Sequence, residues 1–97
     1  ILAVDISASK LKRLEESYSR LGITNIQTRV ADSRTLLPEK ADAVLLDAPC
    51  SGLGVLGRKP DIRWNRKETE MPTLIDLQDA LLDTAAKLVK PSGRLVY

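Results

Sequence analysis

A carboxylate, a proline, a thiol and a glycine lie close together in the segment Asp47-Ala48-Pro49-Cys50-Ser51-Gly52. This segment holds the only cysteine of the chain and follows the apolar run Ala43-Val44-Leu45-Leu46, which is typical of a buried strand. In open α/β sheets, ligands bind beyond the carboxyl ends of the strands. This position favours a chemical role for Asp47 and Cys50. The alternative is that Cys50 is a small buried hydrophobic residue, the commoner fate of a single cysteine.

Two further carboxylates lie at the ends of predicted strands. Asp5 follows the β-rich run Ile1–Val4, and Asp32 follows the predicted strand Asn25–Val30. A carboxylate in the place of Asp5 can accept hydrogen bonds from ribose hydroxyls, and Asp32 could accept one from an adenine amino group. Either residue could instead form a turn or cap a helix. Parallel strands end at one edge of a sheet, so we expect Asp5, Asp32 and Asp47 to gather around one crevice.

Basic residues surround the single tryptophan in the loop that follows Gly52. Basic side chains can pair with phosphates and an indole can stack on a base, so this loop is a candidate RNA contact. The alternative is a solvated loop in which the tryptophan fills the core. The candidate RNA-contacting residues are Pro49, Arg58, Lys59, Arg63 and Trp64, and the basic cluster also includes Arg66 and Lys67.

The elements that must position these side chains alternate in an α/β order, which predicts a mostly parallel sheet. Ser7 or Ser9 is expected to cap the first helix through its side-chain oxygen, and Gly22 is expected to end it in the left-handed conformation. The apolar third strand is expected to be buried on both faces, and Pro91-Ser92-Gly93 is expected to end the second helix. We predict strands over 1–4, 25–30, 43–47 and 94–97, a second helix over 73–89, and loops over 38–40 and 48–72.

The composition indicates a soluble globular chain, since 43% of its 97 residues are hydrophobic and 29% are charged. No apolar stretch is long enough to span a membrane, and no secretory signal is visible. One cysteine cannot form an internal disulfide and fits a reducing, cytoplasmic environment. Because the chain has no histidine, the sequence argues against a zinc site, and we expect no metal. A net charge of +2 is too small to identify a nucleic-acid-binding protein.

The motifs described above resemble those of the RNA 5-methylcytosine methyltransferases, and the similarity is greatest to the subfamily of bacterial 16S ribosomal RNA methyltransferase B. The resemblance covers essentially the whole chain. It implies an α/β, Rossmann-like fold that uses S-adenosylmethionine as methyl donor. The matching residues are Asp47–Gly52, Gly54-Val55, Lys59-Pro60-Asp61-Ile62-Arg63-Trp64, Val4-Asp5-Ile6, Ala31-Asp32 and Leu77-Gln78 with Leu81-Leu82.

The resemblance also implies roles for individual residues. Asp5 is expected to hold the ribose of S-adenosylmethionine and Asp32 to lie near the adenine. Asp47 is expected near the methionine end and the target cytosine of 16S ribosomal RNA. The family uses two cysteines: one attacks C6 of cytosine so that C5 can take the methyl group, which divides a hard step into easier ones. The other, which matches Cys50, helps to release the product after the C5 proton is removed.

Some features of the family have no counterpart in this sequence, which opens and closes on strand-like residues without a start methionine. The glycine-rich cofactor loop would precede Ile1, the attacking cysteine would follow Tyr97, and the N-terminal RNA-binding domain is also missing. We therefore interpret residues 1–97 as a partial catalytic domain and expect the chain itself to be inactive. The family's central strand would lie between those at Ile1–Asp5 and Ala43–Asp47, and without it two sheet edges could pair with another chain.

Three alternatives stay open from the sequence. One is a related cytosine-C5 methyltransferase that acts on transfer RNA. Another is a non-catalytic RNA-binding module that uses the Arg58–Lys67 loop and needs no cofactor. The last is a nicotinamide-dependent oxidoreductase, because Asp5 could serve any ribose-containing cofactor. The Asp47–Gly52 segment has no obvious role in such an enzyme.

Overall fold

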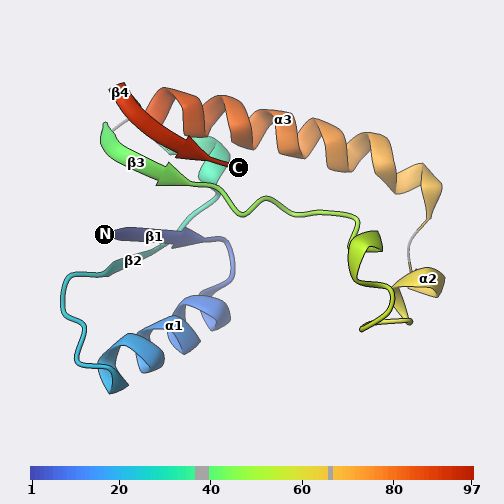
Figure 1. The fold of residues 1–97 in the computed structure, drawn as a ribbon, viewed down its shortest axis with the longest axis horizontal. Coiled ribbons are helices and arrows are strands. Elements are labelled where there is room, and N and C mark those ends of the chain that lie inside the picture. Colours follow the sequence, from blue (N-terminus) through green and yellow to red (C-terminus); the bar gives the residue numbers. More distant parts are fainter. Residues whose placement is uncertain (37–39, 66) are drawn as a thin grey trace. The chain divides into compact units, whose positions relative to one another are not determined.

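The computed structural model describes residues 1–36, 40–65 and 67–97 and divides into two compact units, Ile1–Leu37 and Pro38–Tyr97 (Figure 1). The predicted parallel pairing is confirmed, but the strands form two two-stranded sheets. In the described residues, β1 pairs with β2 and β3 pairs with β4, so the single sheet that the element order predicted is not seen there. Pro38 and Glu39 of the predicted 38–40 loop lie outside the described residues.

The first unit is a strand–helix–strand motif. Helix α1 (Ala8–Arg20) connects β1 (Leu2–Asp5) to the parallel strand β2 (Gln27–Val30). The helix contacts both strands and buries Leu11. Strand β2 begins two residues later than predicted. The structure thus confirms both predicted strands and places a crossover helix between them.

The two ends of α1 give different outcomes for the predicted caps. Ser7 occupies the N-cap position, but its side chain makes no capping hydrogen bond. Its hydroxyl instead bonds a neighbouring serine hydroxyl, so the predicted side-chain cap is wrong. Gly22 has a φ of +69°, as predicted. The amide of Gly22 donates to the carbonyl of Ser19 at 3.0 Å, and that of Ile23 donates to Tyr18 at 2.9 Å, which are the two bonds of a Schellman motif.

The second unit is a parallel pair of strands, β3 (Ala41–Leu45) and β4 (Val89–Val96), which α3 (Met71–Leu88) connects. Figure 1 shows α3 as the longest element, with β3 and β4 beside its C-terminal part. Helix α3 begins two residues before its prediction. Pro72 lies in its first turn, where the missing N–H is not needed.

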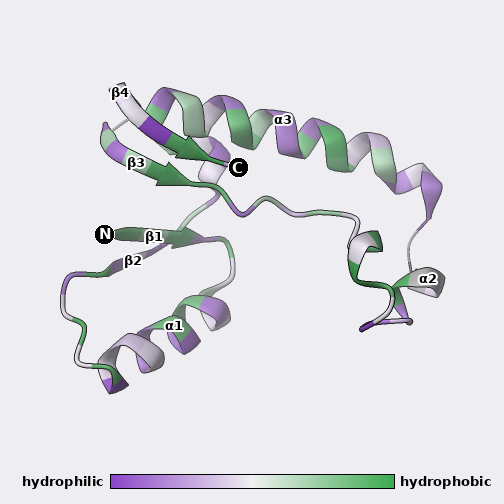
Figure 2. Cartoon of the chain, in the orientation of Figure 1, coloured by the Kyte–Doolittle hydropathy of each residue, from purple (hydrophilic) through white to green (hydrophobic). Residues whose placement is uncertain are grey.

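The apolar side of α3 is as predicted, but the burial of β3 is not. Ala85 is buried, and the other predicted core residues of the helix are half-buried, namely Leu74, Leu77, Leu81 and Leu88. Leu45 is 78% exposed, so the expectation that β3 is buried on both faces is wrong. The reason is that α3 contacts β3, and in the described part of this unit no second layer covers the strand. Figure 2 shows hydrophobic residues along β1 and at the carboxyl end of β3.

Strand β4 starts earlier than predicted because its beginning is irregular. Ala41 is opposite Val89, whereas Ala43 is already opposite Arg94. The Pro91-Ser92-Gly93 segment therefore lies within β4, and the helix ends before it at Leu88. Proline disfavours helical backbone in the residue before it, which explains why the helix does not reach this segment.

The long segment predicted as a loop contains short helices. They are η2 (Leu53–Val55), α2 (Ile62–Asn65) and η3 (Glu68–Glu70), each about one turn long. Gly52 is the N-cap residue of η2 and has a φ of +76°, a conformation that favours glycine. In the described part of the segment before α3, no helix is longer than the four residues of α2, as the breaker residues indicated.

Candidate functional site

Asp5 is the last residue of β1, and Asp32 lies two residues after the end of the neighbouring strand β2. Asp5 is opposite Val30 in the parallel register. The amide of Ala31 then donates to the carbonyl of Asp5 at 3.2 Å, and Asp32 is the next residue. The structure therefore brings these two carboxylates to the same edge of the β1–β2 sheet, as predicted.

The carboxylate of Asp5 is held by the start of α1. Its Oδ1 accepts a hydrogen bond from the amide of Ser7 at 2.7 Å, and its Oδ2 lies 3.4 Å from Nζ of Lys10. The Ser7 amide, with a smaller contribution from Lys10, lowers the pKa of Asp5 below 3.8. The side chain is 30% exposed. Asp5 is thus an ionised turn residue. The contact of its Oδ2 with Lys10 is long, so this oxygen can accept a further hydrogen bond.

Asp32 makes a closer contact with its own turn. It is the N-cap of η1 (Ser33–Thr35), and its Oδ1 accepts a hydrogen bond from the amide of Arg34 at 3.0 Å. Nε of Arg34 lies 3.0 Å from both carboxylate oxygens, and its Nη2 lies 2.5 Å from Oδ2. The Arg34 side chain, together with its amide, lowers the pKa of Asp32 to about 2. Asp32 thus makes the turn contact that the sequence indicated as one possibility, and its role near an adenine stays a prediction.

Replacing Arg34 by leucine is expected to raise the pKa of Asp32 from about 2 toward 3.8. A lowered pKa stabilises the folded state above the unfolded value of 3.8, and this contribution disappears as the pH falls toward 2. The variant should therefore lose less stability than the parent between these two pH values. Carboxyl ¹³C NMR titration measures the pKa directly. Lys10→Leu is the matched control, since it removes a cation from Asp5 and should leave Asp32 unchanged. An Asp32 titration that is identical in Arg34→Leu and the parent would contradict the assignment.

The Asp47–Gly52 segment follows the carboxyl end of β3, but β3 spans Ala41–Leu45 and therefore ends two residues before the predicted end at Asp47. The last bond of the ladder joins the amide of Leu46 to the carbonyl of Val96 at 2.8 Å. Asp47 and Cys50 lie beyond it and are both exposed. The interpretation of Cys50 as a buried hydrophobic residue is therefore wrong. Cys50 is exposed on the second unit.

Gln78, for which the sequence predicted no role, contacts this segment. Its Nε2 donates to the carbonyl oxygen of Pro49 at 2.7 Å, across 29 positions of the chain. The signal in the sequence was a polar residue on the apolar side of a helix, directly after Leu77 and three positions before Leu81. Helix α3 thus holds the residue that precedes Cys50.

The basic loop carries an exposed aromatic ring. Trp64 is 82% exposed, so the alternative in which it fills the core is wrong. Arg58, Lys59 and Lys67 are exposed as well. The side chain of Arg63 and the whole of Arg66 lie outside the described residues. The described part of the loop therefore presents three cations and an indole at the surface.

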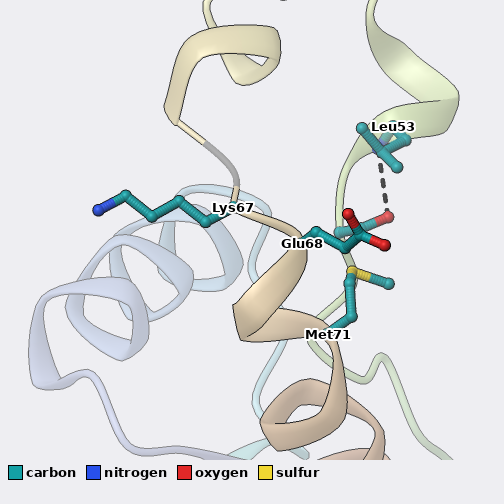
Figure 3. A pocket seen from close by; sticks show the side chains of 5 residues that line it. Leu53, Lys67, Glu68 and Met71 are labelled. Carbon is teal, nitrogen blue, oxygen red and sulfur yellow. Dashed lines mark hydrogen bonds between the residues drawn. The ribbon is translucent and has the colours of Figure 1, made fainter.

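A shallow hollow of about 240 Å³ lies between η2 and the start of α3. Figure 3 shows Glu68 and Met71 close to Leu53, whereas Lys67 extends away from them. The amide of Leu53 donates to Oγ of Ser51 at 3.4 Å. The lining residues are Ser51, Leu53, Lys67, Glu68 and Met71. The hollow therefore begins beside Cys50, but neither Asp47 nor Cys50 lines it.

The predicted crevice involves both units, because Asp5 and Asp32 belong to the first and Asp47 to the second. That all three carboxylates share one site stays a prediction. In residues 1–36, 40–65 and 67–97, no group of three or more His, Cys, Asp or Glu side chains could hold a metal ion. Over the same ranges, no helix has the length and apolar character needed to cross a membrane.

Sequence comparisons place these features in a known family. A model of the family described as 16S rRNA methyltransferase RsmB/F matches residues 1–97. The chain is 39% identical to a probable ribosomal RNA small subunit methyltransferase B of Bacillus subtilis and 44% identical to one of Synechocystis, each over 101 aligned positions. Both alignments cover 100% of this chain and 23% of the relative. The chain thus spans less than a quarter of the length of these curated relatives.

Solved structures show the same similarity. The crystal structure of PH0851 matches with a TM-score of 0.92 and 41% identity, over 98% of this chain and 22% of that one. The crystal structure of NSun6 from Pyrococcus horikoshii with SFG matches with a TM-score of 0.83 and 35% identity, over 98% and 24% of the two chains. These likenesses confirm the predicted methyltransferase fold. The chain belongs to the 16S rRNA methyltransferase RsmB/F family.

Proposed function

We propose that residues 1–97 are part of the catalytic domain of an S-adenosylmethionine-dependent methyltransferase that modifies C5 of a cytosine in 16S ribosomal RNA. The observation that supports this most is the exposed Cys50 thiol, which lies three residues after Asp47 beyond the end of β3. It occurs in a chain whose whole length matches the family. The relatives named as ribosomal RNA small subunit methyltransferase B support the choice of RNA.

The carboxylates of the first unit fit S-adenosylmethionine. Ribose hydroxyls and the adenine amino group are hydrogen-bond donors, and Asp5 and Asp32 are acceptors with lowered pKa values. Oδ2 of Asp5, 3.4 Å from Lys10, would accept a ribose hydroxyl. Asp32 would share its oxygens between Arg34 and the adenine amino group. The similarity to an NSun6 structure with SFG supports this assignment, and the cofactor, when bound, supplies the methyl group.

The second unit would supply the residues at the target base. Asp47 would lie near the cytosine, and Cys50 would act in product release. In release, a base such as water takes the proton from C5. The electrons of the C5–H bond form the C5–C6 double bond as the bond between C6 and the attacking cysteine breaks, and the electrons of that bond leave with the sulfur as a thiolate. Cys50 is exposed at the end of β3, so a base drawn out of the RNA can reach it.

The exposed loop after Gly52 would bind the RNA. Arg58, Lys59 and Lys67 would pair with phosphates, and Trp64 would stack on a base. This loop also favours the alternative of a non-catalytic RNA-binding module. The two functions differ in whether RNA binding leads to methyl transfer.

Transfer of a labelled methyl group is the experiment that tests the proposed function. The full-length protein, incubated with 16S ribosomal RNA and methyl-labelled S-adenosylmethionine, is expected to label C5 of a cytosine. The 97-residue chain, assayed in parallel, is expected to label none. Salt-dependent RNA binding without transfer by the full-length protein would favour the binding module and refute the enzyme.

Replacing Asp32 by alanine in the full-length protein is expected to weaken S-adenosylmethionine binding by about 1–3 kcal/mol, because one polar contact to the cofactor is lost. Isothermal titration calorimetry measures the change in Kd. Asp42→Ala is a suitable control, since Asp42 also pairs with a cation, Nζ of Lys90 at 2.8 Å, but lies at the start of β3. Equal affinities of the Asp32→Ala variant and the parent would count against the adenine role.

A further inference from the structure

The segment that carries Cys50 is tied to α3 by a long-range hydrogen bond. Beyond the last ladder bond at Leu46, the chain leaves the β3–β4 sheet. Nε2 of Gln78 then donates to the carbonyl oxygen of Pro49 at 2.7 Å, a short distance for an amide donor. The bond joins the segment to an element that is packed against the β3–β4 sheet.

This hydrogen bond acts on the peptide group directly before Cys50. The carbonyl of Pro49 and the amide nitrogen of Cys50 belong to one planar peptide unit. The proline ring fixes φ on the other side of that carbonyl. A donor that holds the carbonyl oxygen therefore orients the peptide plane that contains the Cα of Cys50, and so helps to fix the position from which the thiol side chain extends.

Gln78 is well placed to act as a fixed donor. It lies in the middle of α3, between the half-buried residues Leu74 and Leu81, and is itself half-buried. Ala85, one of the two buried core residues of the described chain, anchors the same helix. The donor thus comes from a packed helix rather than from a loop, which is the condition for precise positioning of a reactive group.

We propose that Gln78 is a positioning residue that acts through the carbonyl of Pro49 to hold the Cys50 thiol in the orientation needed for product release. This inference rests on the proposed function, in which Cys50 assists release. Gln78 does not touch the RNA in this role. Its loss should therefore slow release while leaving cofactor binding and methyl transfer unchanged.

The test compares variants of the full-length enzyme in single-turnover assays with 16S ribosomal RNA. Gln78→Leu and Gln78→Glu both remove the donor, and each is expected to lengthen the lifetime of the covalent protein–RNA adduct about tenfold, the effect of one neutral hydrogen bond. Methyl transfer and the KM for S-adenosylmethionine should stay within about twofold of the parent. Gln78→Lys keeps a donor and is expected to restore most of the release rate.

Asp79→Leu is the matched control, because Asp79 is the exposed neighbour of Gln78 on α3, and its adduct lifetime should equal that of the parent. An unchanged lifetime in Gln78→Leu and Gln78→Glu would overturn the positioning role, as would an equal slowing of all steps together with a lower melting temperature. If Cys50→Ala accumulates adduct while the Gln78 variants behave like the parent, only the positioning role fails. If Cys50→Ala accumulates none, the release function and the positioning role fail together.

Discussion

Replacing Cys50 by alanine in the full-length enzyme is expected to leave ribosomal RNA covalently attached to the protein and to lower turnover by at least about 100-fold. The attacking cysteine would still add to C6 and the methyl group would still be transferred, so the reaction would stop before release. Cys50 is exposed and lies beyond the carboxyl end of β3, as the proposed role in release requires. The adduct is measured as an RNA-dependent band of lower mobility on a denaturing gel.

Ser51→Ala provides the control for this experiment. Ser51 is adjacent to Cys50, and its hydroxyl accepts a hydrogen bond from the amide of Leu53 at 3.4 Å, so the variant perturbs the same turn without removing the thiol. It should turn over without accumulating adduct. Rapid turnover by Cys50→Ala, with no slow band on the gel, would show that this cysteine has no part in release.

Replacing Gly93 by alanine is expected to destabilise the β3–β4 sheet by about 1–3 kcal/mol, the usual cost of an overpacked site. A Cβ at this position would lie 2.7 Å from Cγ1 of Val89, 2.8 Å from the carbonyl oxygen of Asp42 and 2.9 Å from that of Lys90. Two of these three neighbours are backbone atoms, so a side-chain rotation cannot relieve the contact. The melting temperature and the urea midpoint report the change.

Gly54→Ala is the matched substitution. Gly54 lies in η2, its φ is not positive, and a Cβ there would meet no atom within 4 Å. Its effect on the free energy of unfolding should stay within about 0.5 kcal/mol, as for most surface changes. If Gly93→Ala and Gly54→Ala had the same effect, the close approach of Gly93 to β3 would not be important for stability.

Most of the fold could be predicted because its signals are local. The left-handed residue at Gly22 and the apolar side of α3 follow from residue type and helical spacing within one element. The predicted element boundaries shifted by a few residues where neighbouring strands decide them, as in β4, which begins at Val89 through an irregular register. A register depends on two segments at once, so it is not visible in either of them.

The site could be predicted in part for the same reason. Asp5, Asp32 and Cys50 stand next to strand ends, and the pattern of apolar residues before them is enough to show this. The partners of these residues were not predicted. Arg34 binds Asp32 through both its amide and its guanidinium, and this depends on the conformation of the η1 turn rather than on the presence of a nearby cation.

Residue types and their order along the chain were sufficient to identify the parallel α/β pattern, the strand-end carboxylates and the family motif around Cys50. The exposure of Cys50 and Trp64, the exposed face of β3 and the bond from Gln78 to Pro49 became apparent only in the folded chain. Periodicity records which side of an element is apolar, but it does not record what covers that side. Burial and long-range hydrogen bonds require two distant segments to meet, and the packing of α3 against the β3–β4 sheet decides which segments do so.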